Sequence, residues 1–237
     1  MNFSNKDYLN YAAARIKPQS TDAVLEVAAG TCACGRALAP LAGNVACLDM
    51  TPAMLSVGKA EAEKAELTNM MFVLGDAMEL PFLDNSFDIV LSRLAFHHFP
   101  HSEQPFVEMV RVLKPNGKLA LIDLEAAEES LRDVEDEIER LRDPSHVRNL
   151  SRAEMLALYQ THGLSVECCE VVKMPLVLQN WLDHTQTPQE VQTEIVRRME
   201  REIAGGEKTG FAPYYKDGKL QFDHRWTLVI GTKGAER

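Results

Sequence analysis

The chain has 237 residues, a length at which one α/β unit can bury a full core and still carry an insertion. Its formal net charge is −10, and no basic tract interleaved with aromatic residues offsets it, so we expect long polyanions to be repelled and predict no nucleic-acid partner. The sequence has no apolar run of about 18 residues and no basic-apolar leader. It therefore predicts a cytoplasmic protein without a membrane span.

An N-terminal helix is predicted over residues 3–17, where apolar side chains recur among polar ones and Pro18 ends the run. We assign residues 1–19 to this N-terminal helical cover. A helix in this place either lies across the mouth of a ligand site or covers the edge of a sheet, and the pattern fits both.

The first predicted strand and the loop after it, residues 23–32, are expected to form the ligand site. Residues 23–28 form an apolar, branched run without Pro or Gly, which is typical of a buried strand. Small residues follow, and a helix is predicted over residues 36–41. Because ligands of open parallel sheets bind beyond the carboxyl ends of the strands, we expect a ligand site around residues 28–32.

The loop after this strand indicates the kind of ligand. The pattern Gly30-x-Cys32-x-x-Gly35 is the dinucleotide fingerprint with its middle glycine replaced. A cysteine at that position hinders the approach of backbone to a pyrophosphate, which favours a nucleoside ligand without one. Glu26 adds negative charge, which favours a cationic ligand.

The second and third predicted strands bring carboxylates to the same edge of the sheet. Residues 45–49 are predicted as a strand that ends at Asp49, and a helix is predicted over residues 52–66. The Asp49 carboxylate can accept both hydroxyls of a ribose. Residues 71–74 are predicted as the third strand, and Asp76 after it can accept a hydrogen bond from an exocyclic amine.

The fourth predicted strand, residues 89–91, leads into a segment with neighbouring histidines. If the chain turns helically after this strand, Arg93, Leu94 and His97 share one face, which we expect to point at the ligand. His98 then either faces the ligand as well or caps and packs.

Cysteines and histidines show no metal-binding pattern. The five cysteines lack the spacing of a zinc site and are expected to be reduced thiols. His97 and His101 stand at i and i+4, a separation that can hold a metal, but Pro100 interrupts the helix between them and no Glu follows His97. We therefore expect no metal site.

The rest of the chain has a weaker pattern. An acidic run over residues 126–143, with apolar residues at helical spacing, predicts an amphipathic helix whose charged face is solvated. His146 and Arg148 follow it and either face a substrate or pair with nearby acids. The other predicted elements are helices over residues 103–113, 151–162 and 178–204, and strands over residues 118–124, 164–174 and 220–232.

The alternation of strands and helices predicts an α/β fold with a right-handed, doubly wound parallel sheet. A specific, ordered series of motifs lies within it: VLEVAAGT at residues 24–31, DMTPAML at 49–55, GDA at 75–77 with LPF at 80–82, SFD at 86–88, and RVLKPNG at 111–117. Together these motifs resemble those of class I S-adenosylmethionine-dependent methyltransferases, in particular the branch similar to quinone-biosynthesis enzymes. The resemblance covers about residues 20–125, and the family usually has glycine where Cys32 stands.

The resemblance implies S-adenosylmethionine as the cofactor and S-adenosylhomocysteine as its demethylated product. It implies a mostly parallel, seven-stranded Rossmann-like sheet in a single domain over residues 1–237. Within that domain, residues 20–125 would bind the cofactor, and residues 126–150 and 176–210 would be helical lid insertions that cover the substrate. The implied cofactor contacts are Glu26, Ala28 and Gly30 around the methionine part, Asp49 on the ribose, Met50 against adenine, and Asp76 with Ala77 at the adenine amine; Thr31 is a further cofactor-binding residue.

Methyl transfer from a sulfonium to a small-molecule acceptor is an in-line displacement that depends on orientation in a dry pocket. If the acceptor is a hydroxyl or an acidic carbon, a histidine can take its proton, and His97 is the first candidate and His98 the second. Two other interpretations stay open: a nicotinamide-dependent oxidoreductase on a similar sheet, and a non-catalytic sensor that binds S-adenosylmethionine.

Overall fold

The computed structural model describes residues 6–126 and 128–235. Its strands are β1 (Ala23–Val27), β2 (Asn44–Asp49), β3 (Met70–Leu74), β4 (Phe87–Arg93), β5 (Leu113–Leu124), β6 (Leu164–Val177), β7 (Tyr214–Lys216) and β8 (Lys219–Lys233). Its helices are α1 (Lys6–Ile16), α2 (Ala33–Leu38), α3 (Pro52–Lys64), α4 (Glu103–Val112), α5 (Arg132–Arg142), α6 (Arg152–Thr161), α7 (Leu178–His184) and α8 (Gln189–Ile203). Three short 3-10 turns are η1 (Ala39–Leu41), η2 (Phe96–His98) and η3 (Glu129–Leu131).

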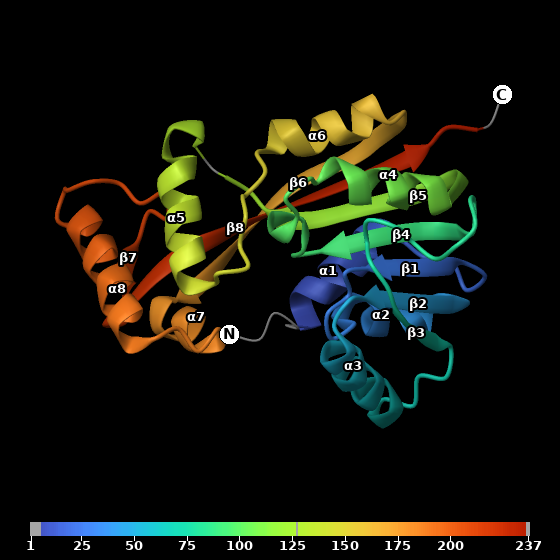
Figure 1. The fold of residues 1–237 in the computed structure, drawn as a ribbon, viewed down its shortest axis with the longest axis horizontal. Coiled ribbons are helices and arrows are strands. Elements are labelled where there is room, and N and C mark those ends of the chain that lie inside the picture. Colours follow the sequence, from blue (N-terminus) through green and yellow to red (C-terminus); the bar gives the residue numbers. More distant parts are fainter. Residues whose placement is uncertain (1–5, 127, 236–237) are drawn as a thin grey trace.

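The strands form one mixed sheet in the order β3-β2-β1-β4-β5-β8-β6 (Figure 1). The first five strands along the chain pair in parallel, and β8 runs antiparallel to both β5 and β6. This order confirms the predicted doubly wound, mostly parallel, Rossmann-like sheet with seven strands. The short β7 is an addition that the sequence pattern did not predict, and it pairs only with β8 among the described strands.

Helices cover both faces of the sheet. Alternate residues of β1 enter different cores, because successive side chains of a strand point to opposite faces. Val24 joins the core under α1, α2 and α3, whereas Leu25 joins the core under α4 and α6. The parallel strands therefore read as continuous apolar runs, as in the segment that predicted β1.

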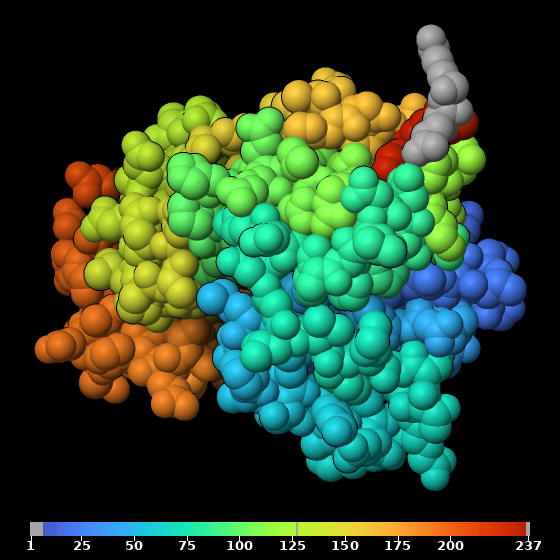
Figure 2. Space-filling model, turned by 45° about the vertical axis from the view of Figure 1, so that its right-hand side comes forward, coloured from blue at the N-terminus to red at the C-terminus, as the bar shows by residue number. Residues whose placement is uncertain are grey.

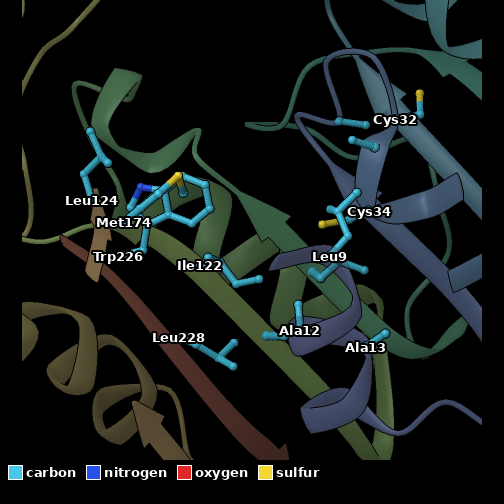
Figure 3. Packing of buried hydrophobic residues seen from close by; sticks show 14 of the residues in the cluster. Leu9, Ala12, Ala13, Cys32, Cys34, Ile122, Leu124, Met174, Trp226 and Leu228 are labelled. Atoms are coloured by element: carbon cyan, nitrogen blue, oxygen red, sulfur yellow. The ribbon is translucent and has the colours of Figure 1, made fainter. Parts of the chain in front are cut away.

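The N-terminal helix lies on one face of the sheet. Leu9, Ala12 and Ala13 of α1 are buried and lie near Cys34 of α2 and near β5 and β8 side chains (Figure 3). Of the two interpretations left open, the contacts of α1 favour that of a cover for the sheet. The predicted helix began at residue 3, but residues 3–5 lie outside the described part of the chain.

Beyond the core, β6 and β8 continue as two long paired strands on which α7 packs, with α5 and α8 beside it (left of Figure 1). We call α5, α7 and α8 the helical extension. Its own small core is aromatic: the Trp181 and Phe222 rings meet edge to face with centroids 5.1 Å apart, and Phe211 meets Phe222 at the same distance.

Several predicted boundaries move. The single helix expected over residues 126–143 is instead η3 followed by α5, and its residue 127 lies outside the described part. The insertion predicted over residues 178–204 is α7 and α8. No helix within residues 6–126 or 128–235 is long and apolar enough to cross a membrane.

Candidate active site

A cleft of about 540 Å³ opens at the carboxyl ends of the parallel strands, beside the helical extension. Figure 2 shows the extension, coloured yellow-green to orange, against the blue and green strand region. Small-molecule sites have volumes of about 300–1,000 Å³. The predicted site residues that line this cleft are Ala28, Gly30, Thr31, Arg93, Leu94, His97 and His98.

The loop after β1 has a backbone conformation that suits glycine. Ala28, Gly30 and Cys32 have φ angles of 51°, 53° and 58°, in the left-handed region that costs non-glycine residues energy. Cys32, which stands where the family usually has glycine, is fully buried. A Cβ on Gly58 of α3 would lie 2.7 Å from Cys32 Sγ, so glycine at position 58 makes room for this cysteine.

Glu26 lies beneath the loop and does not line the cleft. Its carboxylate accepts a hydrogen bond from the Gly35 backbone N–H at 2.6 Å. Burial raises the pKa of Glu26 to about 6, although the Gly35 hydrogen bond and the charge of Arg93 oppose this shift. In this structure Glu26 fixes the start of α2 from below.

Asp49 joins two loops. One carboxylate oxygen accepts from the Gly30 N–H at 2.7 Å and the other from the Thr51 N–H at 2.8 Å. These bonds hold the loop after β1 against the end of β2. Since a carboxylate has about four acceptor positions, Asp49 keeps capacity for ribose hydroxyls.

The other predicted adenine contacts lie outside the cleft lining. Met50 follows β2 and is 74% exposed. Asp76 is exposed and accepts from the Met78 N–H at 2.9 Å, and Ala77 beside it is buried. The structure thus groups Asp49, Met50, Asp76 and Ala77 at the ends of β2 and β3, apart from the histidines.

The segment after β4 does not continue directly into a helix, which was the condition under which its side chains were expected to share one face. β4 continues to Arg93, Leu94 takes a φ of 53°, and only Phe96–His98 form a 3-10 turn. Arg93, Leu94 and His97 nevertheless all line the cleft. The left-handed conformation of Leu94 therefore brings these three side chains to one cleft without the expected helical spacing.

His97 forms a buried pair with Asp123, a residue that the sequence reasoning missed. Its Nδ1 lies 2.5 Å from Asp123 Oδ1, and Asp123 Oδ2 accepts from the Ala95 and Phe96 N–H groups. Burial alone would lower the pKa of His97, but the Asp123 carboxylate and its hydrogen bond outweigh burial and raise it. Asp123 ends the strand predicted beside β4, so its position at the same sheet edge was a usable signal.

His98 also lines the cleft, but its environment differs. Its Nδ1 lies 3.0 Å from the Ser145 carbonyl oxygen. Burial and the neighbouring His97 lower the pKa of His98.

His146 and Arg148 pair with nearby acids, which was one of the two interpretations left open for them. His146 lies 2.8 Å from Asp136, and Arg148 lies 2.6 Å from Glu154.

The prediction of a solvated charged face on the acidic helix holds for Asp133, Glu137 and Arg140, but it is wrong for the other charged residues of the helix. α5 buries several charged residues, namely Arg132, Glu135, Asp136, Glu139 and Arg142. Asp136 pairs with His146 and Glu139 with His224, whereas Arg132 pairs with Glu129 and Glu154. No local sequence signal identifies this face, since its partners lie far along the chain.

The wall opposite the strand loops consists of Arg142, Asp143, His184, Thr185 and His224, none of which was predicted as a site residue. Among residues 6–126 and 128–235, no group of three or more histidine, cysteine or acidic side chains is arranged to hold a metal ion.

Comparison with known proteins places this geometry in a family. Residues 25–121 match the family described as "Methyltransferase domain". The uncharacterized methyltransferase YcgJ of Bacillus subtilis is 32% identical over 177 residues, which are 74% of this chain and 70% of that protein. The uncharacterized protein YafE of Escherichia coli is 35% identical over 169 residues, 71% of this chain and 81% of that protein.

The structural comparison agrees. The crystal structure of YcgJ matches with a TM-score of 0.87 and 26% identity, over 98% of this chain and 100% of that one.

A shorter sequence match is to the demethylmenaquinone methyltransferase of Listeria welshimeri. It is 47% identical over 81 residues, which make up 34% of each protein.

A nucleotide-type loop on a Rossmann-like sheet, with a cleft at the strand ends, is typical of a protein that binds a nucleoside-containing cofactor. The chain belongs to the class I S-adenosylmethionine-dependent methyltransferases. Its cofactor is S-adenosylmethionine and its reaction is methyl transfer, which decides against the oxidoreductase interpretation.

Proposed function

We propose that this enzyme methylates a hydroxyl oxygen or an acidic carbon of a small-molecule acceptor, with His97 as general base. One observation carries the proposal: His97 lines the cleft while its Nδ1 is held by the buried Asp123 carboxylate at 2.5 Å. With Asp123 on Nδ1, the nitrogen that can take the acceptor proton is Nε2.

The residues at the other end of the cleft fit the cofactor. A Cβ built on Gly30 would meet no atom within 4 Å, so the loop leaves open space, and Asp49 offers acceptors for a ribose. Arg93 has a buried Nη1 without a hydrogen-bond partner in the described residues, which suits the carboxylate of the methionine part. When bound, S-adenosylmethionine supplies an electrophilic methyl group on a sulfonium.

The chain's contribution to the reaction is orientation and proton removal. Leu94, Met54 and Leu124 give the cleft apolar surface that excludes water. Orientation of the reactants removes about 7–11 kcal/mol of such barriers, and general base catalysis adds a factor of about 10²–10⁴. In this proposal His98, tied to Ser145, supports the position of His97.

The size and charge of the site support a small acceptor. Cofactor and acceptor share a cleft of about 540 Å³, and the net charge of −10 opposes nucleic acid. We propose that residues 1–19 and the segments 126–150 and 176–210 are the cover and the substrate-covering parts of a single domain over residues 1–237.

The test is a screen for methyl transfer from labelled S-adenosylmethionine to phenols, hydroxy acids and acidic carbon compounds, with thiols and amines alongside. Because only neutral His97 can accept a proton, turnover should rise with pH through the raised pKa of His97. Asp123→Asn removes the charge that raises this pKa, so the rise should move to lower pH. A pH profile that Asp123→Asn leaves unmoved, or turnover only with amines, would contradict the proposal.

A further inference from the structure

The wall opposite the strand loops carries a buried arginine that the proposed mechanism does not use. Arg142 ends α5, is 8% exposed and lines the cleft. Its guanidinium lies over the Trp181 ring, 4.4 Å from the ring centroid, which restricts its position. Trp181 in turn belongs to the aromatic core of the helical extension.

The acids near Arg142 contact it only at long distance. Nε lies 3.4 Å from Glu139 Oε2, and Nη2 lies 3.9 Å from Asp143 Oδ2. Charge-assisted hydrogen bonds of this kind are about 2.7–2.9 Å long. Within the described residues, the buried Nε and Nη1 atoms make no hydrogen bond. A buried guanidinium left in this state is unfavourable, because its donors have lost water without gaining acceptors.

Both acids are engaged by other donors. Glu139 Oε1 lies 3.2 Å from His224 Nε2, and Asp143 Oδ1 accepts from the Ser145 hydroxyl at 2.6 Å. Burial would raise the pKa of Glu139, but the His224 hydrogen bond and Arg142 outweigh it and lower the pKa to about 2. Glu139 is therefore an ionised carboxylate that orients two cleft residues, Arg142 and His224, from behind.

His224, like Arg142, is a buried residue of the cleft wall with a nitrogen atom that has no partner in the described part of the chain. It is 5% exposed, lines the cleft, and its Nδ1 is buried without a hydrogen-bond partner in the described residues. Two side chains from different elements, α5 and β8, thus line one end of one cleft, and each has a buried nitrogen atom without a hydrogen-bond partner in the described residues. Glu139 contacts both side chains and so holds Arg142 and His224 in place relative to each other.

We propose that Arg142 and His224 form a carboxylate-binding subsite, so that the methyl acceptor is a small carboxylic acid anchored at the end of the cleft away from the strand loops. The inference rests on the proposed function. The planar fork of an arginine binds a carboxylate through two parallel hydrogen bonds. The bound carboxylate supplies the acceptors that Arg142 lacks, and the reacting atom is then held within reach of His97 in the same cleft.

The carboxylate of the cofactor has a different candidate partner. Arg93 follows Ser92, which pairs with Val27 of β1, so Arg93 lies directly beside the loop that begins at Ala28. Arg142, in contrast, lies with His184, Thr185 and His224 on the wall formed by the extension and β8. Two arginines that line different parts of the cleft, the half-buried Arg93 and the buried Arg142, match two carboxylates, one on the cofactor and one on the acceptor.

The test uses the full-length protein saturated with S-adenosylhomocysteine. Acetate and acetamide, which match in shape but differ in charge, are titrated while the ¹⁵N ring signals of His224 are followed by NMR. Acetate should shift these signals saturably, and acetamide should bind roughly tenfold more weakly or not at all, as loss of charge-assisted hydrogen bonds requires. Arg142→Gln should lower the affinity for acetate to the level of acetamide, and Arg142→Lys should give an intermediate affinity, because it keeps the charge but loses the fork. Arg140→Gln is the control on the same helix, since Arg140 is exposed and donates to the Val147 carbonyl oxygen.

Each remaining outcome decides the question. Equal responses to acetate and acetamide in the unchanged protein would overturn the subsite without use of any variant, so a poorly folded Arg142→Gln protein does not leave the question open. An unchanged acetate affinity in Arg142→Gln, or a tenfold loss of S-adenosylhomocysteine affinity in it, would also overturn the subsite; the second would assign Arg142 to the cofactor. Methyl transfer to neutral phenols without any preference for carboxylic acids would contradict the subsite but not the proposed function. Failure of the unchanged protein to bind S-adenosylhomocysteine would sink both.

Discussion

The two ends of the cleft are built in different ways. At the end that we propose for the cofactor, backbone geometry dominates: Ala28, Gly30 and Cys32 take left-handed conformations, and Asp49 holds the loop by accepting from backbone N–H groups. At the end that we propose for the acceptor, side chains dominate, and each is fixed by a distant partner. His97 and Asp123 are 26 positions apart, and His224 and Glu139 are 85 positions apart. A loop that binds a common cofactor can be encoded locally, whereas the acceptor end requires the whole fold.

The largest expected effect lies at the acceptor end. His97→Ala should lower turnover by about 10²–10⁴-fold and leave cofactor affinity almost unchanged, because a general base acts only on the chemical step. The measurement is kcat with an acceptor found in the screen, alongside calorimetry with S-adenosylhomocysteine. His101→Ala, at an exposed histidine nearby, is the control. Near-full turnover in His97→Ala would mean that orientation alone drives the reaction.

The next effect should appear at the cofactor end. Asp49→Ala removes acceptors for the ribose and the bonds that hold the loop, and charge-assisted hydrogen bonds are worth about 1.5–3 kcal/mol each. Affinity for S-adenosylhomocysteine, measured by calorimetry, should therefore fall about 10–100-fold. Asp76→Ala, at an exposed carboxylate, is the comparison and should change affinity less. If both variants bind as the unchanged protein does, these carboxylates do not hold the cofactor.

Glu26 should make the stability of the cofactor end depend on pH. Its folded pKa of about 6 lies above the usual 4.5, so the folded state holds the proton more tightly, and stability falls as pH rises from 4.5 to 6. Above that window the ionised group costs about 2 kcal/mol. Between pH 4.5 and pH 7, the free energy of unfolding of Glu26→Gln, measured with urea, should rise by about this amount relative to that of the unchanged protein. A constant difference across that range would mean that Glu26 ionises normally.

The smallest effect tests the backbone of the loop. Ala28 has a φ of 51°, so Ala28→Gly should raise the free energy of unfolding by about 0.5–1 kcal/mol, because glycine adopts this region without a Cβ clash. Ala29 is not among the residues with positive φ, so Ala29→Gly should lower stability by about 0.4–1 kcal/mol. Thermal unfolding of the two variants gives the contrast. Equal changes in both would contradict a strained loop.

The contrast between the two ends also explains what sequence can predict. Apolar runs and small residues predicted the strands, their parallel pairing and the position of the loop, since these depend on residues close in sequence. Helical spacing placed Arg93, Leu94 and His97 together although the observed turn is different. The buried face of α5 was assigned to solvent, because charges alone do not reveal that Glu139 meets His224. The strands predicted over residues 164–174 and 220–232 nearly match β6 and β8, and the main difference is that the last three residues of β6 were missed.

The continuous pairing of β6 with β8 has a mechanical consequence. The pairing runs from Leu164 opposite Lys233 to Val177 opposite Gln221, so the same ladder supports both the core and the helical extension. To swing the extension away from the core would bend or break the paired strands that carry it, because β6 and β8 stay hydrogen-bonded to each other beyond the end of β5. Ligand exchange must then proceed by small displacements of α5, α7 and the loops near His97. In hydrogen exchange, backbone amides on the outer part of the ladder should be protected almost as strongly as those in the core.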